Sequence, residues 1–418
     1  MKKTVRRGPI SQESPEIALE GLLRTELHAF ALKAGLEVLG AMFESEREAV
    51  CGPRYRHIEG RKAYRAAHAP GEPVLGGRRV RLSRPRAREV GGREVVLPSW
   101  RAFTAEDPLG ERAYEQMVLG VATRGYGRSL EAVPEGLEAR GESKSAVSRR
   151  LVAATRAQLE EFLSKPLEGV DLKVLMLDGL HFAEHVVLVA LGIDSGGRKH
   201  LLGLAEGATE NAAACLALLA SLRERGLRAE RSLLVVTDGS KALPKAVREV
   251  FGGRAMVQRC QVHKKRNVLD HLPKGMRGQV SASLSQAYHG RDPERARRLL
   301  MGLARKLEAA YPGAAASLRE GLDETLTVMG MGLPASLERT LSSTNVIENL
   351  LGTVRGVSRR VKRWRGGGMI LRWMAAGLME AGKGFRRVRA YQGMARLSPA
   401  LERNDERIDG KLKVEEAA

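Results

Sequence analysis

The chain has 418 residues, of which 43% are hydrophobic, so it can bury cores in two or three domains and is not a disordered tail. Its 70 Lys and Arg residues outnumber its 49 Asp and Glu residues, which leaves a formal charge of +21. Because such an excess most often serves to neutralise phosphates, we expect a nucleic-acid partner rather than an acidic membrane or a merely soluble basic surface.

The cysteines and the first residues bear on where the protein works. Cys51, Cys215 and Cys260 are too few and too far apart for a disulfide framework, which suits a reducing cytosol. The basic start MKKTVRRGPISQESPE has no apolar run behind it, so it is not a secretory signal. No apolar stretch reaches the roughly 20 residues that cross a bilayer. We therefore expect a soluble intracellular protein with no membrane partner.

The first hundred residues predict two small modules. In residues 1–50, Leu and Ala recur at helical spacing from residue 15 onward, which predicts an amphipathic helical pair. In residues 51–100, short alternating segments punctuated by Gly and Pro predict β-hairpins, with Arg at many polar positions. This second module is either a DNA-contacting unit or a solvated basic hairpin.

Residues 101–168 return to a helical period. Ser143 is placed as an N-cap before an apolar stripe, and a short helix with a Gly turn precedes it. The pattern is typical of a helix-turn-helix or, equally, of an ordinary helical hairpin. In the first case the second helix offers four polar residues to the DNA major groove: Lys144, Ser145, Ser148 and Arg149.

Residues 169–264 predict an α/β domain. Three β-rich runs, LKVLMLDGL, HVVLVALGID and KHLLGLAEG, follow one another with short connections and predict an antiparallel meander. A helix, a strand, a second helix and a second strand come next. The resulting order, βββαβαβ in a mixed sheet, matches the ribonuclease-H-like fold.

The remaining residues divide into an insertion, a return to the α/β domain and a tail. Residues 265–341 read as helical throughout and predict an all-α insertion. Residues 342–395 resume with the amphipathic helix STNVIENLLGTVRGVSRRVKRW and continue as basic helices. Residues 396–418 form a tail whose acidic end we predict to be disordered.

Three acids lie at positions that this fold is expected to bring close to one another. Asp178 ends the first strand, Asp238 follows the fourth strand, and Glu348 lies on the helix after the insertion. Phosphoryl transfer between DNA strands is served by two hard cations about 4 Å apart, which prefer carboxylate ligands. A carboxylate cluster of this kind repels itself without metal, which raises pKa values. The three acids are therefore our candidate metal-binding and catalytic residues.

Each acid also has a local explanation. Asp178 and Asp238 each precede a glycine, and Asp-Gly is a common turn signal. Glu348 lies three residues after Asn345, so the two can form a capping box that only starts a helix. Taken one at a time these explanations are as good as catalysis, but an ordered set of three acids in a basic protein favours the metal site.

Five separated motifs carry a resemblance to a known family. The runs VLMLDGLHFAEHVVLVALGID, VVTDGSKAL, VQRCQVHKKRNV, STNVIEN and VKRWRGGGMILRW, in this order, resemble the Mutator-type transposases of bacterial insertion sequences. The resemblance covers roughly residues 100–395. It implies a ribonuclease-H-like catalytic domain with a helical insertion and a catalytic triad of Asp178, Asp238 and Glu348. The family's Cys-x-x-His motif falls on Cys260 and His263.

The resemblance also implies an activity and its partners. It implies a DNA transposase that cuts at the terminal inverted repeats of its element and transfers the strand into target DNA. Two Mg²⁺ ions, for which Mn²⁺ may substitute, would be held with Asp178 bridging both ions. It further implies a homo-oligomer, a dimer when active, in the bacterial cytoplasm and associated with the nucleoid. The alternatives are a ribonuclease-H-like nuclease that does not join strands and a domesticated DNA-binding protein without chemistry.

Two further groups of residues remain hypotheses. Residues 355–389 are dense in Lys and Arg, which suits contact with DNA phosphates. The DNA-binding candidates there are Arg359, Arg360, Arg363, Trp364 and Arg365, with the tryptophan able to stack on a base. Trp373 is better explained as a core residue. Cys260 and His263 lack the second ligand pair that zinc expects, so we assign them to packing or to positioning DNA near the site.

Overall fold

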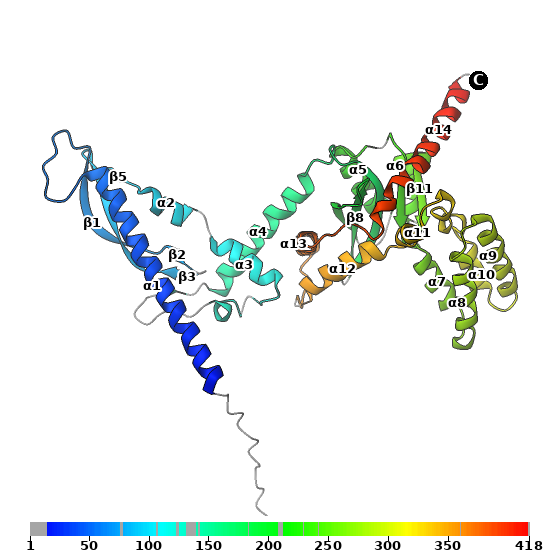
Figure 1. The fold of residues 1–418 in the computed structure, drawn as a ribbon, viewed down its shortest axis with the longest axis horizontal. Coiled ribbons are helices and arrows are strands. Elements are labelled where there is room, and N and C mark those ends of the chain that lie inside the picture. The colour runs from blue at the N-terminus through cyan, green and yellow to red at the C-terminus, as the bar shows by residue number, and fades with distance from the viewer. Residues whose placement is uncertain are drawn as a thin grey trace, which may run out of the picture. The chain divides into compact units, whose positions relative to one another are not determined.

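A computed structural model describes most of the chain (Figure 1). The described residues are 15–75, 78–105, 108–122, 125–130, 139–140, 143–182, 184–207, 212–228, 230–240, 242–359 and 361–416. They form two compact units, Met1–Ala154 and Thr155–Ala418. Among the described helices, none combines the length and apolar character that a bilayer crossing requires.

The first unit begins with one helix where the sequence predicts a helical pair. Helix α1 runs without a break over Pro15–Cys51. The prediction of a pair is wrong because nothing in this stretch ends a helix: it contains no proline after Pro15, and Gly35 and Gly40 keep helical backbone. Its C-terminal half packs through Leu39 and Phe43 on Leu97 and Trp100, which form a small core.

This unit also contains two small antiparallel sheets. The first has the order β1-β4-β5 and the second the order β2-β3-β6. Their strands are β1 (Ala63–Gly71), β2 (Val74–Leu75), β3 (Arg78–Val80), β4 (Leu82–Glu89), β5 (Glu94–Val95) and β6 (Ala139–Arg140). The hairpins predicted for residues 51–100 are therefore present, and Arg84 and Arg86 both pair with Glu94 across them.

Helices follow the hairpins. They are α2 (Pro98–Ala105), α3 (Pro108–Val118), the 3-10 turn η1 (Tyr126–Ser129) and α4 (Lys144–Ser164). As predicted, Ser143 caps α4, because its hydroxyl accepts a hydrogen bond from the Ala146 amide at 3.2 Å. Residues 131–138 lie outside the described part of the chain, so the helix-turn-helix stays a prediction.

The second unit is built on a five-stranded mixed sheet in the order β11-β10-β7-β8-β9. Strands β7 (Leu172–Phe182), β8 (His185–Asp194) and β9 (Lys199–Gly207) are antiparallel, which confirms the predicted meander. Strands β10 (Leu233–Thr237) and β11 (Ala255–Arg259) run parallel to β7. With α5 (Ala212–Glu224) and α6 (Ala242–Phe251) between the later strands, the element order is the predicted βββαβαβ.

Helices cover both faces of this sheet. Because side chains alternate along a strand, Leu175 and Leu177 of β7 face α5 and α6, while Val174 and Met176 face the other side. That second side is covered by α12 (Asn345–Ser358) and α13 (Gly367–Lys383). The two helices approach closely at Gly377, where an added Cβ would lie 3.0 Å from Val354.

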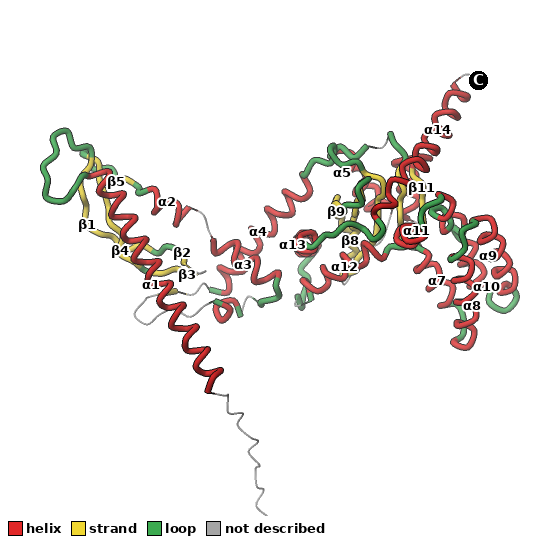
Figure 2. The backbone as a smooth tube through the Cα atoms, in the orientation of Figure 1, coloured by secondary structure: helices red, strands yellow, loops and turns green. Residues whose placement is uncertain are grey.

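The region between β11 and α12 is helical, as predicted. Its helices are α7 (Gln261–Asp270), α8 (Lys274–Tyr288), α9 (Pro293–Glu308), α10 (Pro312–Arg319) and α11 (Ala335–Leu341). Helices α7 to α10 form a group beside the sheet with a core of its own (Figure 2). Buried Lys264 connects α7 to the end of α10. Its Nζ donates to the carbonyls of Ser317 and Glu320 at 2.7 and 2.6 Å.

The tail is helical as far as Glu416, where the described residues end, contrary to the prediction of disorder. Helix α14 spans Leu397–Glu416, and its first turns bury apolar side chains against the sheet core. The buried Asn404 amide donates to Ser232 Oγ at 2.8 Å, and Asp405 pairs with Arg254 at 2.8 Å. Charge pattern alone missed this helix because its acids have specific partners in the α/β domain.

Candidate active site

Sheet register brings two of the predicted acids side by side. Strand β10 pairs in parallel with β7 so that Thr237 lies opposite Leu177, and Asp238 and Asp178 are the next residues on each strand. Both acids continue the alternation of Val174, Met176 and their partners on β10, so both face α12. Asp238 follows its strand as predicted, whereas Asp178 lies inside β7 rather than at its end.

The local surroundings of these two acids differ. Asp178 is 7% exposed and is paired with Val189 within the sheet, so the turn explanation is wrong for it. Its Oδ1 accepts a hydrogen bond from the Gly179 amide at 2.9 Å. Asp238 is half-buried and does shape the turn after its strand, because its Oδ1 accepts from the Ser240 amide at 2.9 Å.

The third acid comes from the first turn of α12. The N-cap of this helix is Thr344, and Asn345 is already helical, so the proposed capping box with Asn345 is not formed. Instead, the Thr344 hydroxyl donates to Glu348 Oε1 at 2.5 Å. The hydroxyl therefore fixes the carboxylate of Glu348 toward the sheet end rather than toward the helix backbone.

Electrostatics shows that the three acids form one cluster. The pKa of Asp178 is raised from 3.8 to about 7, first by burial and then by the negative charges of Asp238 and Glu348. The Gly179 amide and nearby His263 act in the opposite direction. Two neighbouring negative charges therefore oppose the ionisation of Asp178, which is the effect expected where acids gather to bind a cation.

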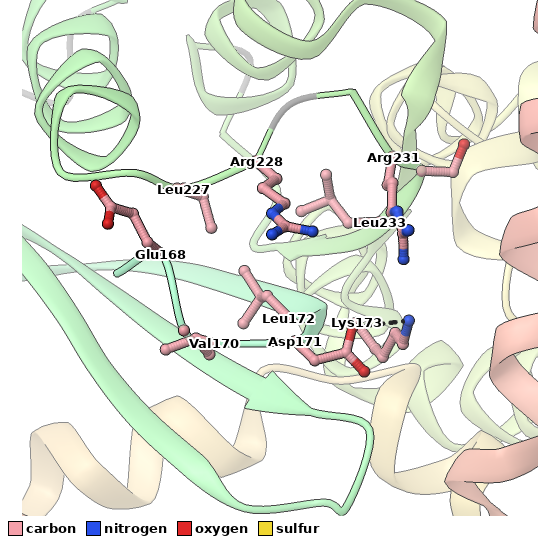
Figure 3. A pocket seen from close by; sticks show the side chains of 11 residues that line it. Glu168, Val170, Asp171, Leu172, Lys173, Leu227, Arg228, Arg231 and Leu233 are labelled. Carbon is pink, nitrogen blue, oxygen red and sulfur yellow. Dashed lines mark ion pairs between the residues drawn. The ribbon is translucent and has the colours of Figure 1, made fainter. Parts of the chain in front are cut away.

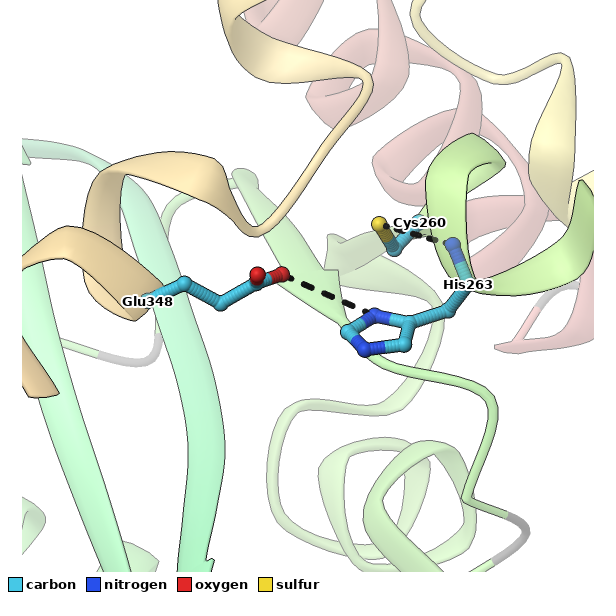
Figure 4. A group of neighbouring side chains, drawn as sticks. All are labelled: Cys260, His263 and Glu348. Atoms are coloured by element: carbon cyan, nitrogen blue, oxygen red, sulfur yellow. Dashed lines mark hydrogen bonds and ion pairs between the residues drawn. The ribbon is translucent and has the colours of Figure 1, made fainter. Parts of the chain in front are cut away.

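Cys260 and His263 stand beside Glu348 (Figure 4). Cys260 is buried at the start of α7, where its Sγ accepts from the His263 amide at 3.5 Å and from the Thr344 amide at 3.4 Å. His263 Nδ1 lies 3.7 Å from Glu348 Oε1 and 3.2 Å from Thr344 Oγ1. The motif thus links the start of α7 to the start of α12, which agrees with a packing or positioning role.

These contacts also set the charge of the pair. Interaction with the Cys260 sulfur raises the pKa of His263 to about 9, helped by the charges of Glu348 and Asp238. Although burial opposes it, the hydrogen bonds from His263 and Thr344 lower the pKa of the Cys260 thiol. A positive imidazole therefore borders the acid cluster at neutral pH.

The residues predicted to contact DNA are distributed over both units. Lys144, Ser145, Ser148 and Arg149 are exposed on α4, and Arg359, Arg363 and Arg365 are exposed after α12. Arg360 lies outside the described residues. Trp364 packs edge-on against Phe182 with ring centroids 4.9 Å apart, so much of its ring faces the sheet core.

A separate hollow lies at the other end of the strands (Figure 3). It is formed where β7 and β10 begin, around Asp171, Lys173 and Arg231. Asp171 pairs with Lys173 at 3.0 Å, and the side chains shown include no member of the acid cluster. This hollow and the three acids therefore lie at opposite ends of the paired stretch of β7 and β10.

Thr344 is the site residue that the sequence analysis missed. A signal existed, because a hydroxyl residue directly before an apolar helix is a typical N-cap. Its contacts with Cys260 and Glu348 join residues that are 84 and 4 positions away, and the longer of these separations is not readable from spacing.

Comparison with known proteins decides the family. A family model described as "Transposase, Mutator family" matches residues 32–387, which is most of the chain. The chain belongs to this family. Membership agrees with the resemblance carried by the five motifs, and DNA transposition is the function that it supports.

Relatives of this Mutator-family chain are transposases of bacterial insertion sequences. The transposase for insertion sequence element IS6120 of Mycolicibacterium smegmatis is 33% identical over 221 residues, covering 51% of this chain and 67% of the relative. That for ISRM5 of Rhizobium meliloti is 30% identical, covering 67% and 73%. That for IS256 in transposon Tn4001 of Staphylococcus aureus is 26% identical, covering 76% and 81%.

Proposed function

We propose that this chain is a DNA transposase whose acid cluster of Asp178, Asp238 and Glu348 carries out metal-dependent DNA cleavage and strand transfer. The observation that carries the proposal is the convergence of the three acids from two neighbouring strands and one helix. The raised pKa of Asp178, to which the charges of Asp238 and Glu348 contribute, supports the proposal. We assign a ribonuclease-H-like fold to the catalytic domain, and the sheet order and the helical region after β11 support this assignment.

The acids fit divalent cations by their chemistry. All three offer carboxylate oxygens, the ligands that hard cations prefer, and their repulsion is relieved when a cation is bound. We infer that Asp178, Asp238 and Glu348 would hold two divalent ions, with Mg²⁺ as the natural ion and Mn²⁺ as its substitute. Bound there, the ions supply charge neutralisation at the attacking and leaving oxygens of the phosphodiester.

The chain's own residues prepare this site. Asp178 is fixed by the sheet and by the Gly179 amide, so its carboxylate needs no reorganisation. Thr344 holds Glu348, and the positive His263 beside it offsets part of the negative charge before DNA arrives. Exposed Arg359, Arg363 and Arg365 follow the helix that carries Glu348, where they can contact DNA phosphates.

The names of the relatives point to the DNA substrate. They are transposases of insertion sequences. We therefore infer that this chain acts on the terminal inverted repeats of its own element and on target DNA. A homodimer would bring two ends together, and the setting would be the nucleoid in a bacterial cytoplasm.

A joining assay tests the function against its alternatives. A labelled duplex with the element's own end, already cut at the 3′ side, is incubated with supercoiled plasmid and Mg²⁺ or Mn²⁺. A transposase gives labelled strands joined covalently to the plasmid. Nicked plasmid without joined label would instead indicate a nuclease, and bound but unchanged DNA would indicate a domesticated binding protein.

A further inference from the structure

A basic hollow lies beside the helix that carries Glu348. Its volume is about 460 Å³, and it is formed by α11, the start of α12, the start of β9 and the segment after α13. The side chains that matter are Lys199, Arg339, Asn345, Asn349, Arg387 and Arg389. We call this hollow the α11–α12 basic pocket.

Charge in this pocket is unbalanced. Four cationic side chains line it, and none of the residues that line it is acidic. Arg339, Arg387 and Arg389 are exposed, and within the described residues no carboxylate forms an ion pair with them. The hollow around Asp171 in Figure 3 differs, since two acids lie among its cations. The α11–α12 basic pocket therefore has uncompensated positive charge, which an anion would neutralise.

The pocket is held in shape by its own contacts. The Val388 amide donates to the Gly197 carbonyl at 2.9 Å, and buried Val388 leaves its neighbours Arg387 and Arg389 pointing outward. Gly197 has φ +75°, and a Cβ there would lie 2.5 Å from Tyr391, so this approach requires glycine.

Stacking orders the cations further. The Arg387 guanidinium lies 4.7 Å from the Tyr391 ring centroid, and Lys199 Nζ lies 5.3 Å from that of Phe385. The Thr340 hydroxyl of α11 lies 3.4 Å from the Arg389 carbonyl, although the Ser336 carbonyl at 2.9 Å is the nearer acceptor of its proton. Side chains ordered in this way lose less entropy when they bind an anion.

Helix α12 connects this pocket to the acid cluster. Asn345 and Asn349, one turn apart, line the pocket, while Glu348 is displaced around the helix by about 60° from Asn345 and about 100° from Asn349. Ser343 and Asn345 also line the pocket on either side of Thr344, whose hydroxyl holds Glu348. A polymer with regularly spaced phosphates can reach both sites along one helix.

We propose that the α11–α12 basic pocket binds a backbone phosphodiester of the DNA on which the acid cluster acts, with its arginines as phosphate contacts and its two asparagines as neutral hydrogen-bond donors. This inference rests on the proposed function, because it takes DNA as the substrate. It assigns to the pocket a positioning role and no chemistry. The acid cluster acts on the reacting phosphate, while the pocket binds a neighbouring phosphate of the same DNA.

The test measures salt dependence rather than activity. The full chain binds a short fluorescein-labelled duplex of random sequence in EDTA, and log K is followed against log salt. The double variant Arg387→Gln/Arg389→Gln should reduce the slope by about two, because each substitution removes one cation that neutralises a phosphate. The control Arg223→Gln/Lys245→Gln, on exposed positions of α5 and α6 on the other side of the sheet, should keep the wild-type slope.

Two further variants separate the possible outcomes. Arg387→Lys/Arg389→Lys should retain the slope, because charge is kept; a reduction equal to that of the Gln pair would overturn a phosphate contact. A Gln pair with the slope of its control would also overturn the proposal. Asp178→Asn should bind with wild-type slope, so a failure of the acid cluster in cleavage leaves this measurement unaffected.

Activity then identifies which DNA occupies the pocket. With the Gln pair, cleavage of a duplex carrying the element's own end is compared with the joining of a pre-cut end to plasmid. Loss of joining alone assigns the pocket to target DNA, and loss of both assigns it to the element's end. Wild-type rates in both reactions would contradict a positioning role.

Discussion

The environment of Asp178 makes the stability of the folded chain depend on pH. The pKa of this residue is raised from 3.8 to about 7 by burial and by the neighbouring acids, so the folded chain holds this proton more tightly than the unfolded chain. The stability that this group contributes is therefore full below pH 4 and is lost as pH rises through 7. Burial and the neighbouring acids favour the protonated form of Asp178, and a bound cation would favour the ionised form instead.

The substitution Asp178→Asn should thus stabilise the metal-free protein at high pH. Melting in EDTA at about pH 8 should give a higher Tm for the variant, with a gain of at most about 4 kcal/mol, and the gain should shrink as pH falls toward 4. Asp270→Asn, on an exposed position of α7, should change neither value. A decrease of Tm that is the same at both pH values would contradict the raised pKa.

Thr344 is expected to act through Glu348 rather than on DNA. Thr344→Val removes the hydroxyl that bonds Glu348 while it keeps the side-chain shape. Hydrogen bonds to charged groups contribute roughly 1.5–3 kcal/mol, so the cleavage rate should fall about tenfold to a hundredfold. DNA affinity in EDTA should stay at the wild-type value.

The matched control for this variant lies on the same helix. Thr353 is exposed on α12, and its hydroxyl contacts only the Asn349 carbonyl, at 3.4 Å. Thr353→Val should cleave DNA at the wild-type rate. If the two variants are equally slow, removal of any helix hydroxyl, rather than of the bond to Glu348, explains the effect.

At the scale of elements, the helical insertion depends on buried polar contacts as well as on its apolar core. Lys264 of α7 caps the end of α10 through two carbonyls, and buried Gln258 of β11 donates to the Thr325 carbonyl at 2.9 Å and accepts from the Val328 amide at 2.8 Å. These bonds connect the strand that precedes the insertion to the loops within it. Buried hydrogen bonds of Gln258 therefore connect the insertion to the sheet.

Lys264→Met should loosen α10 without unfolding the sheet. The change leaves the Ser317 and Glu320 carbonyls without their donor, at a cost of about 1–3 kcal/mol for each buried group. Hydrogen exchange of the α10 amides should become faster by roughly one and a half to four orders of magnitude, as a combined cost of about 2–6 kcal/mol for the two carbonyls implies. Arg266→Met, at an exposed position of α7, should leave this exchange unchanged; equal acceleration in both variants would contradict the anchoring role.

At the scale of the whole molecule, elements were predictable where the sequence pattern is local. The apolar runs around Asp178 and Asp238 predicted the meander and the mixed sheet, because fully buried strands need such runs. The length of α1 and the order of α14 were not predicted. The absence of a helix-ending residue after Pro15 is a local signal for one long helix that the predicted pair overlooked, whereas the acids of α14 acquire partners such as Arg254 only in the folded protein.

The site was predictable in part for the same reason. Element order alone placed Asp178, Asp238 and Glu348 together, and the structure brings them together. It could not reveal that Thr344 bridges Cys260 and Glu348, or that Lys199, Arg339 and Arg387 share one pocket. Those groupings depend on contacts between segments that are far apart in the chain.

Strand cleavage by isosteric acid variants tests the central proposal most directly. A labelled duplex carrying the element's own end is incubated with Mg²⁺ or Mn²⁺ and with the wild type, Asp178→Asn, Asp238→Asn, Glu348→Gln or the control Asp270→Asn, and DNA binding is measured alongside. The account predicts that all five proteins bind the duplex and that only the wild type and the control cut it. Cutting at the wild-type rate by any of the three acid variants would contradict the assignment of the acid cluster.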